Sequence, residues 1–339
     1  MKRTVTILLS LVIIAVIGAA SGVMYVSGKV TDELTLESET LFTIESGSNA
    51  YRTVKLLRKA EITDVPPFVA KVWLKFFAGS TAVKSGTYML RPDQSLVDAF
   101  TLFTQGEEHF FAISLVEGLT LYQWIETLKQ NTDLVFDLDD DELNQLSQGN
   151  GVDWCCEQVP HTEGLYLADT YFFTKGTTAS EVLKRAHRAL IEFVSYEWEQ
   201  RDIELPLATP YEALILASII EKETAVPEER DMISGVFVNR LNKNMRLQTD
   251  PTVIYGIGPT FDGNITRKHL RTATPYNTYV IKGLPPTPIA MAGKAAIHAA
   301  LHPLPTDALY FVAKGDGSHQ FSTSLADHNA AVRKYQLKQ

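Results

Sequence analysis

The segment Leu214–Thr224 reads LILASIIEKET and is the most informative part of this chain. Eight uncharged residues, Ala213 to Ile220, run directly into two carboxylates, Glu221 and Glu223. A helix this apolar is normally buried, so a carboxyl group carried at its end is partly desolvated. Desolvation raises the pKa, and an acid that stays protonated near neutral pH can protonate a poor leaving group. The segment therefore predicts a buried helix that ends in a candidate general acid.

The two glutamates are expected to differ. They are two positions apart, about 200° around a helix, so they cannot share a face. The bulkier apolar stripe lies under Glu223 at helical spacing and comprises Leu216, Ile219 and Ile220. We therefore expect Glu223 to be the more desolvated acid and Glu221 to be structural. The alternative is that both residues simply end a helix and meet solvent.

Composition narrows the class of protein. The chain has 339 residues, 45% of them hydrophobic and 21% charged, which is an ordinary globular composition with room for two or three domains. Its net charge of −9 argues against a nucleic-acid partner, which usually leaves a basic footprint. No Gly-rich phosphate loop is present, and we predict no cofactor.

The N-terminus predicts a membrane anchor. Lys2 and Arg3 precede an uncharged run from Thr4 to Gly28, long enough as a helix (roughly 37 Å) to cross a bilayer core of about 30 Å. The following segment is mostly acidic, so the positive-inside rule places the N-terminus in the cytoplasm and the remainder outside. A cleaved signal peptide with small residues at Gly18–Ala20 is the alternative, but the uncharged run continues well past Ala20.

The rest of the chain mixes helices and strands without a βαβ rhythm, which predicts an α+β fold. A strand at 41–44, helices at 51–59 and 68–77, a strand at 86–90 and a helix at 95–105 form a first module. A strand at 110–115, helices at 121–128 and 178–200, the helix from Tyr211, another from Pro227, a hairpin at 308–323 and a final helix at 325–337 follow. From residue 251 to this hairpin the chain reads as irregular. We divide it into the anchor (1–28), a stalk (29–39), a first module (40–115), a linking helical region (116–205) and a candidate catalytic domain (206–339).

Polar groups cluster in sequence after the apolar helix. Sugar sites are typically built from amide, hydroxyl, carboxylate and aromatic groups, because a sugar presents hydroxyls on its edge and C–H groups on its face. The candidate substrate-binding residues are Asn239, Gln248, Thr249, Asp250, Tyr255, Tyr276, Asn277 and His319. The alternative reading is that these side chains stabilise loops and cap turns.

Histidine and cysteine give weaker signals. His298 and His302 are spaced i, i+4, but the segment HAALH lacks the glutamate of a zinc-protease motif and Pro303 ends it, so we predict no metal site. The adjacent Cys155 and Cys156 would form a strained ring if bridged, and the sequence assigns them no role.

Several longer motifs resemble the bacterial endolytic murein transglycosylase (YceG-like) family. They occur in family order: EGL at 163–165, DTY at 169–171, ASIIEKET at 217–224, VNRL at 238–241, LQTDPTVIYG at 247–256, YNTY at 276–279, GLPP at 283–286, YFVA at 310–313, HQF at 319–321 and HN at 328–329. The chain departs from the family pattern at Leu167-Ala168, where relatives often have Phe-Pro, and at Met291-Ala292-Gly293, where many read Asn-Pro-Gly. Both departures concern local loop shape and neither touches the proposed acid.

The resemblance implies a single-pass inner-membrane protein with a LysM-like module and a mixed α+β catalytic domain in the periplasm. It implies cleavage of MurNAc–GlcNAc bonds within peptidoglycan strands, with Glu223 as the catalytic acid and base and a 1,6-anhydroMurNAc end as product. Peptidoglycan is then the substrate, the cytoplasmic membrane a partner, and peptidoglycan synthases are candidate partners. Two alternatives stay open: a non-catalytic glycan-binding scaffold of the cell-wall machinery, and a hydrolase that uses Glu223 with Asp250.

Overall fold

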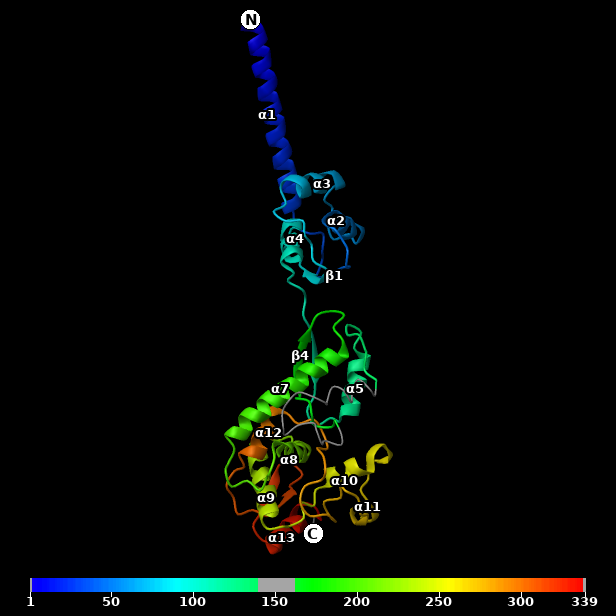
Figure 1. The fold of residues 1–339 in the computed structure, drawn as a ribbon, viewed down its shortest axis with the longest axis vertical. Helices are drawn as coiled ribbons and strands as arrows, with labels where there is room; N and C mark the ends of the chain where they lie inside the picture. Colours follow the sequence, from blue (N-terminus) through cyan, green and yellow to red (C-terminus); the bar gives the residue numbers. More distant parts are fainter. Residues whose placement is uncertain (1, 140–161, 338–339) are drawn as a thin grey trace. The chain divides into compact units, whose positions relative to one another are not determined.

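The computed structural model describes residues 2–139 and 162–337, so Cys155 and Cys156 lie outside the described part. The chain divides into two compact units, residues 1–111 and 112–339 (Figure 1). The described part mixes helices with three two-stranded sheets, so the expected α+β class is confirmed.

The first unit begins with the predicted apolar helix, α1 (Lys2–Thr31). Its segment Arg3–Thr31 has a mean hydropathy of 2.6 and is the one helix in the described residues long and apolar enough to cross a membrane. The last turns of α1 differ from the rest, because Val26 and Val30 are buried in the core of this unit. The stalk predicted at 29–39 is also part of the unit: Leu34 is buried in the same core and its N–H donates to the carbonyl of Gln94.

The core of the first unit lies between a hairpin-like sheet and three helices. Strand β1 (Thr40–Ile44) pairs antiparallel with β2 (Gly86–Leu90), so that Phe42 faces Tyr88. Helices α2 (Ala50–Lys59) and α3 (Pro67–Phe76) connect the two strands, and α4 (Leu96–Gln105) follows β2. Aromatic rings fill the interior: Trp73 meets Phe100 edge to face at 5.0 Å between ring centroids. The strand–helix–helix–strand order follows the predicted pattern, and the LysM-like assignment stays a prediction.

The second unit has a helical core with two small sheets. Strand β3 (Phe111–Leu115) pairs with β4 (Asp169–Phe173), and α5 (Leu121–Gln130) follows β3. The helices at the centre are α7 (Ala179–Glu199), α8 (Pro210–Glu223), α9 (Arg230–Asn242, preceded by the 3-10 turn Pro227–Glu229) and α12 (Lys294–Leu301). Helix α12 packs against α7, α8 and α9 (Figure 1).

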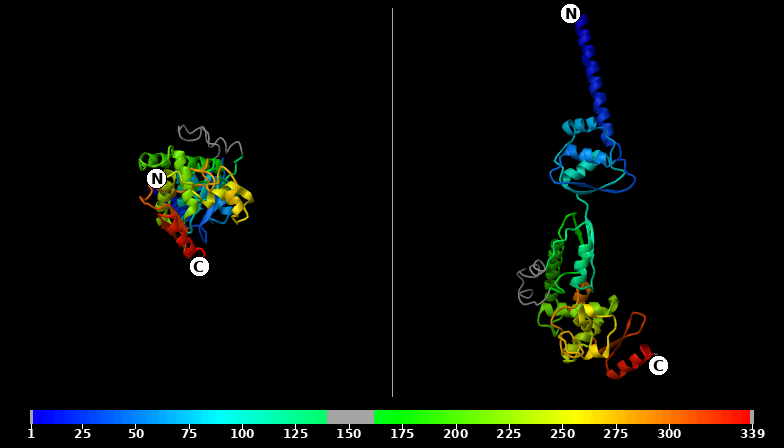
Figure 2. Two further views of the ribbon diagram at one scale, coloured as in Figure 1. Left: turned by 90° about the horizontal axis from the view of Figure 1, so that it is seen from below. Right: turned by 90° about the vertical axis from the view of Figure 1, so that its right-hand side faces the viewer.

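The C-terminal part of this unit carries the predicted hairpin. Strands β5 (Tyr310–Ala313) and β6 (His319–Ser322) are antiparallel, and α13 (Leu325–Tyr335) packs on both of them. The hairpin and α13 are drawn in orange and red in Figure 2. The segment after residue 250, expected to be irregular, instead contains α10 (Asp250–Ile257), the 3-10 turn Gly258–Thr260 and α11 (Arg267–Arg271) as well as α12.

The two departures from the family pattern are packed segments. Met291 is fully buried, and its backbone exchanges hydrogen bonds with the loop before α5, accepting from Gly118 at 2.8 Å and donating to Leu119 at 2.8 Å. Leu167 is buried as well; its N–H donates to the carbonyl of Ala186, and its own carbonyl accepts from the Tyr171 hydroxyl. These contacts fix both loops.

Candidate active site

Helix α8 places Glu221 and Glu223 at the end of a buried apolar segment, as the sequence predicts. Thr209 caps its first turn by accepting from the N–H of Glu212, and Pro210 occupies the first helical position. Every residue from Ala213 to Ile220 is buried. The helix therefore presents its last turn, with both acids, from a fixed position.

The two acids point to different surroundings. The Glu221 side chain is only 5% exposed, accepts a 3.0 Å hydrogen bond from the N–H of Gly293 and lies 3.6 Å from the guanidinium of Arg230. Burial raises the pKa of Glu221, and the Gly293 and Arg230 contacts oppose that rise. Burial raises the pKa of both glutamates, and the larger rise is at Glu223, as expected. Their partners differ as well, because Gly293 ties Glu221 to the loop before α12 and Arg230 lies at the start of α9.

Glu223 lies at an open cavity of about 570 Å³ and is partly exposed. It accepts a hydrogen bond from the hydroxyl of Thr249. Burial of the carboxyl raises the pKa of Glu223 to about 6, helped by the negative charge of Asp250 and opposed by the Thr249 hydrogen bond and the positive charges of His319 and Arg240. Glu223 is thus a carboxylic acid that titrates close to neutral pH and can reach solvent or a ligand.

Thr249 is held in place by a threonine on a neighbouring loop. The N–H of Thr249 donates to the hydroxyl of Thr278 at 3.1 Å, and the N–H of Gln248 donates to the Thr278 carbonyl at 3.1 Å. Gln248 has a φ of 51°, a left-handed conformation that these hydrogen bonds hold in place. The strained turn at Gln248 therefore presents the Thr249 hydroxyl to Glu223.

Arg240 supplies a fixed positive charge near the acid. It is 7% exposed and bridges two backbone segments, with Nε donating to the carbonyl of Leu309 at 2.6 Å and Nη1 to that of Leu247 at 2.7 Å. Its guanidinium also lies over the ring of Tyr310, 5.2 Å from the centroid. Because Nε and Nη1 are both hydrogen-bonded to the backbone, the guanidinium charge stays in position when Glu223 gains or loses a proton.

Histidine and aspartate complete the polar lining. His319 on β6 is held by Glu229: its N–H donates to Oε1 at 2.9 Å and Nδ1 lies 2.6 Å from Oε2. Asp250, at the start of α10, accepts a 2.7 Å hydrogen bond from the Tyr279 hydroxyl. Burial lowers the pKa of His328, which stacks on Tyr310 with centroids 5.2 Å apart. The cavity thus combines the carboxyl groups of Glu223 and Asp250 with hydroxyl, amide, imidazole and aromatic groups.

Four of the eight predicted binding residues line this cavity: Gln248, Thr249, Asp250 and His319. The other four have structural contacts elsewhere. The amide of Asn239 donates to the carbonyls of Thr306 and Ala308, and that of Asn277, only 1% exposed, donates to the carbonyls of His269 and Thr272. Tyr255 and Tyr276 pack against each other at 5.0 Å between ring centroids. Their hydroxyls contact Glu163 and Thr287, respectively.

Arg240, Tyr279, Tyr310 and Asn329 also line the cavity, although none of them is among the eight predicted binding residues. Arg240 and Tyr279 belong to the polar segments that the sequence indicated near the acid. Arg240 carried a usable signal. It lies three and four positions after Phe237 and Val236, so a charge sits on the apolar stripe of its helix. A charged residue on a buried helical face requires hydrogen-bonding partners, which marks it for a structural or functional role.

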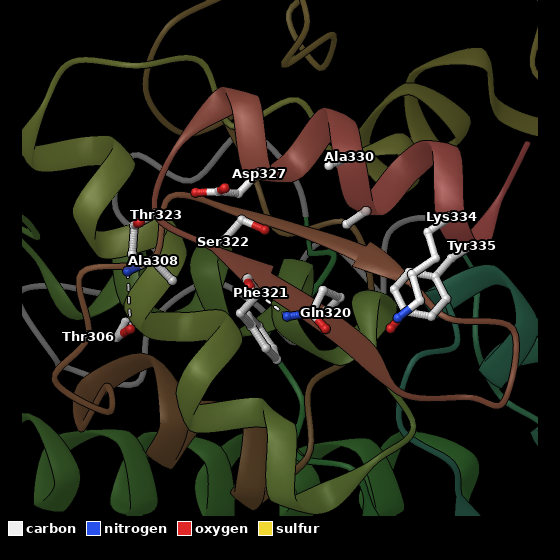
Figure 3. Close-up of a pocket in the computed structure, with 11 residues that line it drawn as sticks. Thr306, Ala308, Gln320, Phe321, Ser322, Thr323, Asp327, Ala330, Lys334 and Tyr335 are labelled. Atoms are coloured by element: carbon white, nitrogen blue, oxygen red, sulfur yellow. Dashed lines mark hydrogen bonds between the residues drawn. The ribbon is translucent and has the colours of Figure 1, made fainter. Parts of the chain in front are cut away.

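A second hollow, of about 540 Å³, lies between β6 and α13 and contains Gln320, Asp327, Lys334 and Tyr335 (Figure 3). Its acid, Asp327, is exposed and accepts a 2.6 Å hydrogen bond from the hydroxyl of Ser324, the N-cap of α13. A capping carboxylate in solvent lacks the desolvation that makes an acid useful near neutral pH. The cavity at Glu223 is therefore the better candidate.

Comparison with known proteins defines the class. The family model described as the YceG-like family matches residues 42–334, so this chain belongs to that family, and the predicted resemblance is confirmed. A Bacillus subtilis (strain 168) protein named endolytic murein transglycosylase is 33% identical over 308 residues, covering 86% of this chain and 83% of that protein.

A protein of the same name from Streptococcus pneumoniae (strain R6) is 25% identical over 335 residues and extends further, since the match covers 88% of this chain but 60% of that protein. The fold also matches the crystal structure of a YceG-like protein from Listeria monocytogenes. Its TM-score is 0.56 at 27% identity, with 87% of this chain and 99% of that chain covered.

Proposed function

We propose that this chain is an endolytic murein transglycosylase, a lyase that cleaves MurNAc–GlcNAc bonds within peptidoglycan strands. The observation that carries the proposal is Glu223, whose raised pKa and open polar cavity suit an acid that meets a glycan. Membership of the YceG-like family and the names of its relatives support the same activity.

In the proposed reaction, Glu223 gives its proton to the glycosidic oxygen as the bond from that oxygen to C1 of the muramyl sugar breaks. The 6-hydroxyl of the same sugar attacks C1, and the Glu223 carboxylate takes the proton that this hydroxyl loses. The products are a free 4-hydroxyl on GlcNAc and a 1,6-anhydroMurNAc end. Because the nucleophile belongs to the substrate, the paired carboxylates of most glycosidases are not required.

The pKa of Glu223 suits both halves of this cycle. With a pKa of about 6, about one tenth of the acid is protonated at pH 7, against about one in 300 at an unperturbed pKa near 4.5. The positive charge of Arg240 and the hydroxyl of Thr249 favour the carboxylate that forms after the first proton transfer. Burial favours the acid and these two groups favour its conjugate base, which is the balance that an acid and base catalyst needs.

Substrate binding is assigned to the residues that line the cavity with the acid. Gln248, Asp250 and His319 supply polar groups of the type that bind sugar hydroxyls, and Tyr279 and Tyr310 supply aromatic groups. The Asp250 carboxylate is the one observation that favours a second function, because hydrolysis would use it to activate a water.

We also propose an orientation and a role for the first unit. Lys2 and Arg3 favour a cytoplasmic N-terminus, which places the rest of the chain in the periplasm. The antiparallel β1–β2 pair with α2 and α3 between the strands supports a LysM-like, glycan-binding module. Ending glycan elongation on nascent strands would bring the protein close to peptidoglycan synthases.

The test uses the full chain in detergent, incubated with purified uncrosslinked glycan strands, with fragments weighed by mass spectrometry. We expect ends lighter by one water than reducing ends, and long fragments before disaccharides, as internal cleavage produces. Reducing ends would instead support the hydrolase that uses Glu223 and Asp250. Uncleaved strands would support the non-catalytic scaffold.

Two variants complete the test of the assignment. Glu223→Gln keeps the shape of the side chain and should abolish cleavage. Glu221→Gln is the matched control, because its amide oxygen can still accept from the N–H of Gly293, and it should keep most of the activity. Full activity in Glu223→Gln would remove the catalytic assignment.

A further inference from the structure

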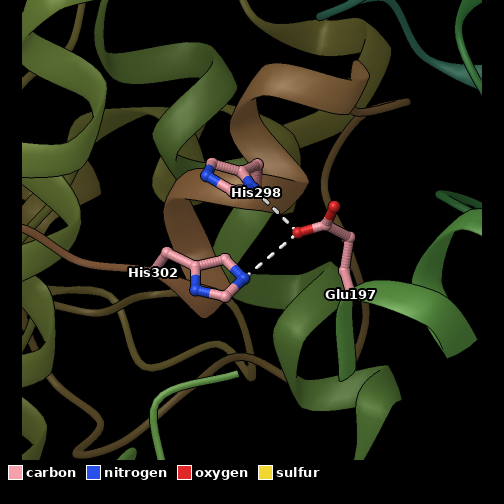
Figure 4. Close-up of side chains that lie close together, drawn as sticks. All are labelled: Glu197, His298 and His302. Atoms are coloured by element: carbon pink, nitrogen blue, oxygen red, sulfur yellow. Dashed lines mark hydrogen bonds and ion pairs between the residues drawn. The ribbon is translucent and has the colours of Figure 1, made fainter. Parts of the chain in front are cut away.

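Three side chains outside the lining of the Glu223 cavity converge on one point. Glu197, near the end of α7, meets His298 and His302, at the end of α12 (Figure 4). Oε2 of Glu197 lies 2.7 Å from Nδ1 of His298 and 3.2 Å from Nε2 of His302. None of the three residues lines the cavity that contains Glu223.

The geometry of the cluster is that of a metal site. One ligand atom from each of the three residues lies within 4.8 Å of the other two. Ligand atoms around a tetrahedral Zn²⁺, each bound at about 2.0–2.1 Å, are separated by about 3.3 Å. The separations of 2.7 and 3.2 Å between Glu197 and the two histidines would therefore have to widen by about 0.6 and about 0.1 Å to hold the ion. Two histidines and one glutamate are also a common set of protein ligands for a zinc ion that keeps one position for water.

The backbone supplies the convergence. His298 and His302 are four positions apart, so a helix sets their rings one above the other, and the ring centroids are 4.4 Å apart at an interplanar angle of 29°. The third ligand comes from a different helix, 101 residues earlier in sequence. The segment HAALH has no glutamate of its own, and the distant Glu197 cannot be recognised from local spacing. This is why the sequence alone predicted no metal site here.

Burial and charge agree with this interpretation. The Glu197 side chain is 10% exposed, and a carboxylate so shielded from water needs positive charge or hydrogen bonds around it. The His298 side chain is 54% exposed, which leaves the site open to an ion from solvent. A carboxylate oxygen and two imidazole nitrogens are ligand atoms that a divalent transition-metal ion accepts.

We propose that Glu197, His298 and His302 bind a divalent transition-metal ion of the zinc type, which joins the ends of α7 and α12. Because α12 packs along α8, the helix that ends at Glu223, this ion fastens the support of the candidate active site and takes no part in the reaction. The rival arrangement is a metal-free pair of histidines hydrogen-bonded to one carboxylate. The proposal does not depend on the reaction proposed above.

The experiment measures binding of Zn²⁺ alone to the full chain in detergent after treatment with a chelator. We expect one equivalent of Zn²⁺ by equilibrium dialysis with metal analysis, and Co²⁺ in its place should give the visible absorption of a tetrahedral site. Zn²⁺ should also raise the thermal unfolding temperature, because an ion that binds only the folded state stabilises it.

The variants Glu197→Gln and His298→Asn/His302→Asn identify the ligands. Loss of outer groups around a metal already weakens binding about 10- to 100-fold, so loss of these ligands should weaken it by at least about 100-fold. His109→Asn, which changes a histidine in the first unit, is the matched control and should bind Zn²⁺ like the unchanged protein.

Thermal unfolding without metal shows whether each variant is folded, and a folded variant that no longer responds to Zn²⁺ supports the site. Absence of Zn²⁺ binding in the unchanged protein, or undiminished binding in both folded variants, would overturn the proposal.

Discussion

Removing the Thr249 hydroxyl tests how the protein sets the pKa of Glu223. In Thr249→Val the side chain keeps its shape but can no longer donate to the Glu223 carboxylate. A hydrogen bond to a charged group contributes about 1.5–3 kcal/mol, and we take the lower end because Glu223 is partly exposed. Since one pKa unit corresponds to about 1.4 kcal/mol, the loss should raise the pKa by about one unit, from about 6 to about 7.

The sign of the effect on activity follows from the role of the acid. The proposed first step requires protonated Glu223, so kcat/KM should fall as pH rises through its pKa. In the unchanged protein this fall should be centred near pH 6, and in Thr249→Val near pH 7. The assay is the rate of fragment release from glycan strands at a series of pH values, at substrate concentrations below KM.

The control is Thr260→Val, an exposed threonine whose hydroxyl donates to the Ile257 carbonyl. It removes a threonine hydroxyl away from the acid and should leave the pH profile unchanged. A profile in Thr249→Val that is unmoved, or moved to lower pH, would refute the role assigned to this hydrogen bond, provided that the variant unfolds at the same temperature as the unchanged protein.

Three further predictions concern stability. Burial raises the pKa of Glu163 from 4.5 to about 7, so the folded state holds this proton more tightly than the unfolded state does. The free energy of unfolding should therefore fall by up to about 3 kcal/mol as pH rises from 4.5 through 7. In Glu163→Gln this fall should be smaller, as measured by thermal unfolding at pH 5 and pH 8. Arg240→Lys keeps the charge but cannot donate to both carbonyls at once, which should cost about 2 kcal/mol in chemical denaturation, and a loss below about 0.5 kcal/mol would contradict the bridging role. Trp73→Ala empties a position only 5% exposed and should destabilise the first unit by about 3–5 kcal/mol, read from its own unfolding transition.

The elements that sequence predicted well are those fixed by local pattern. Helix α8 follows from an uninterrupted apolar run after a threonine cap and a proline, and the β5–β6 hairpin follows from two short strand-like runs around a glycine-containing turn. In both cases the residues that decide the element are neighbours in the chain. The same is true of the first unit, whose strands and helices lie close to their predicted bounds.

The elements that sequence missed depend on distant partners or on weak local signals. Strand β4 has its partner, β3, more than fifty residues earlier, and no turn joins them. Helix α10 is only eight residues long, and its proline and glycine read as loop signals, although proline at a first helical turn is favourable. Helix α12 was not predicted either, because the prolines and glycine around it are typical loop signals.

The candidate site shows the same division. The acid at the end of α8 could be chosen from its own helix, and the neighbours Gln248, Thr249 and Asp250 from their closeness in sequence. The contacts that hold Asn239 and Asn277 in structural roles come from other segments and could not be read locally. Polar composition suggested a sugar site, but only tertiary packing decides which polar side chains face the cavity.

Glu163 and Glu223 show how the protein sets the pKa of a desolvated carboxyl group. Glu163 accepts a hydrogen bond from the N–H of Leu121 at 2.9 Å and one from Tyr255, without a cation among the groups that set its pKa, and burial raises that pKa to about 7. Glu223 is desolvated as well, but the hydrogen bond from Thr249, and after it the nearby His319 and Arg240, oppose the rise, and its pKa stays at about 6. An acid whose pKa is raised by burial alone would give up its proton less readily. Its carboxylate form would also be less populated near neutral pH. The Thr249 hydroxyl and the fixed cation beside Glu223 therefore favour its carboxylate form, as the proposed acid and base cycle requires, and Glu163 has no such cation among the groups that set its pKa.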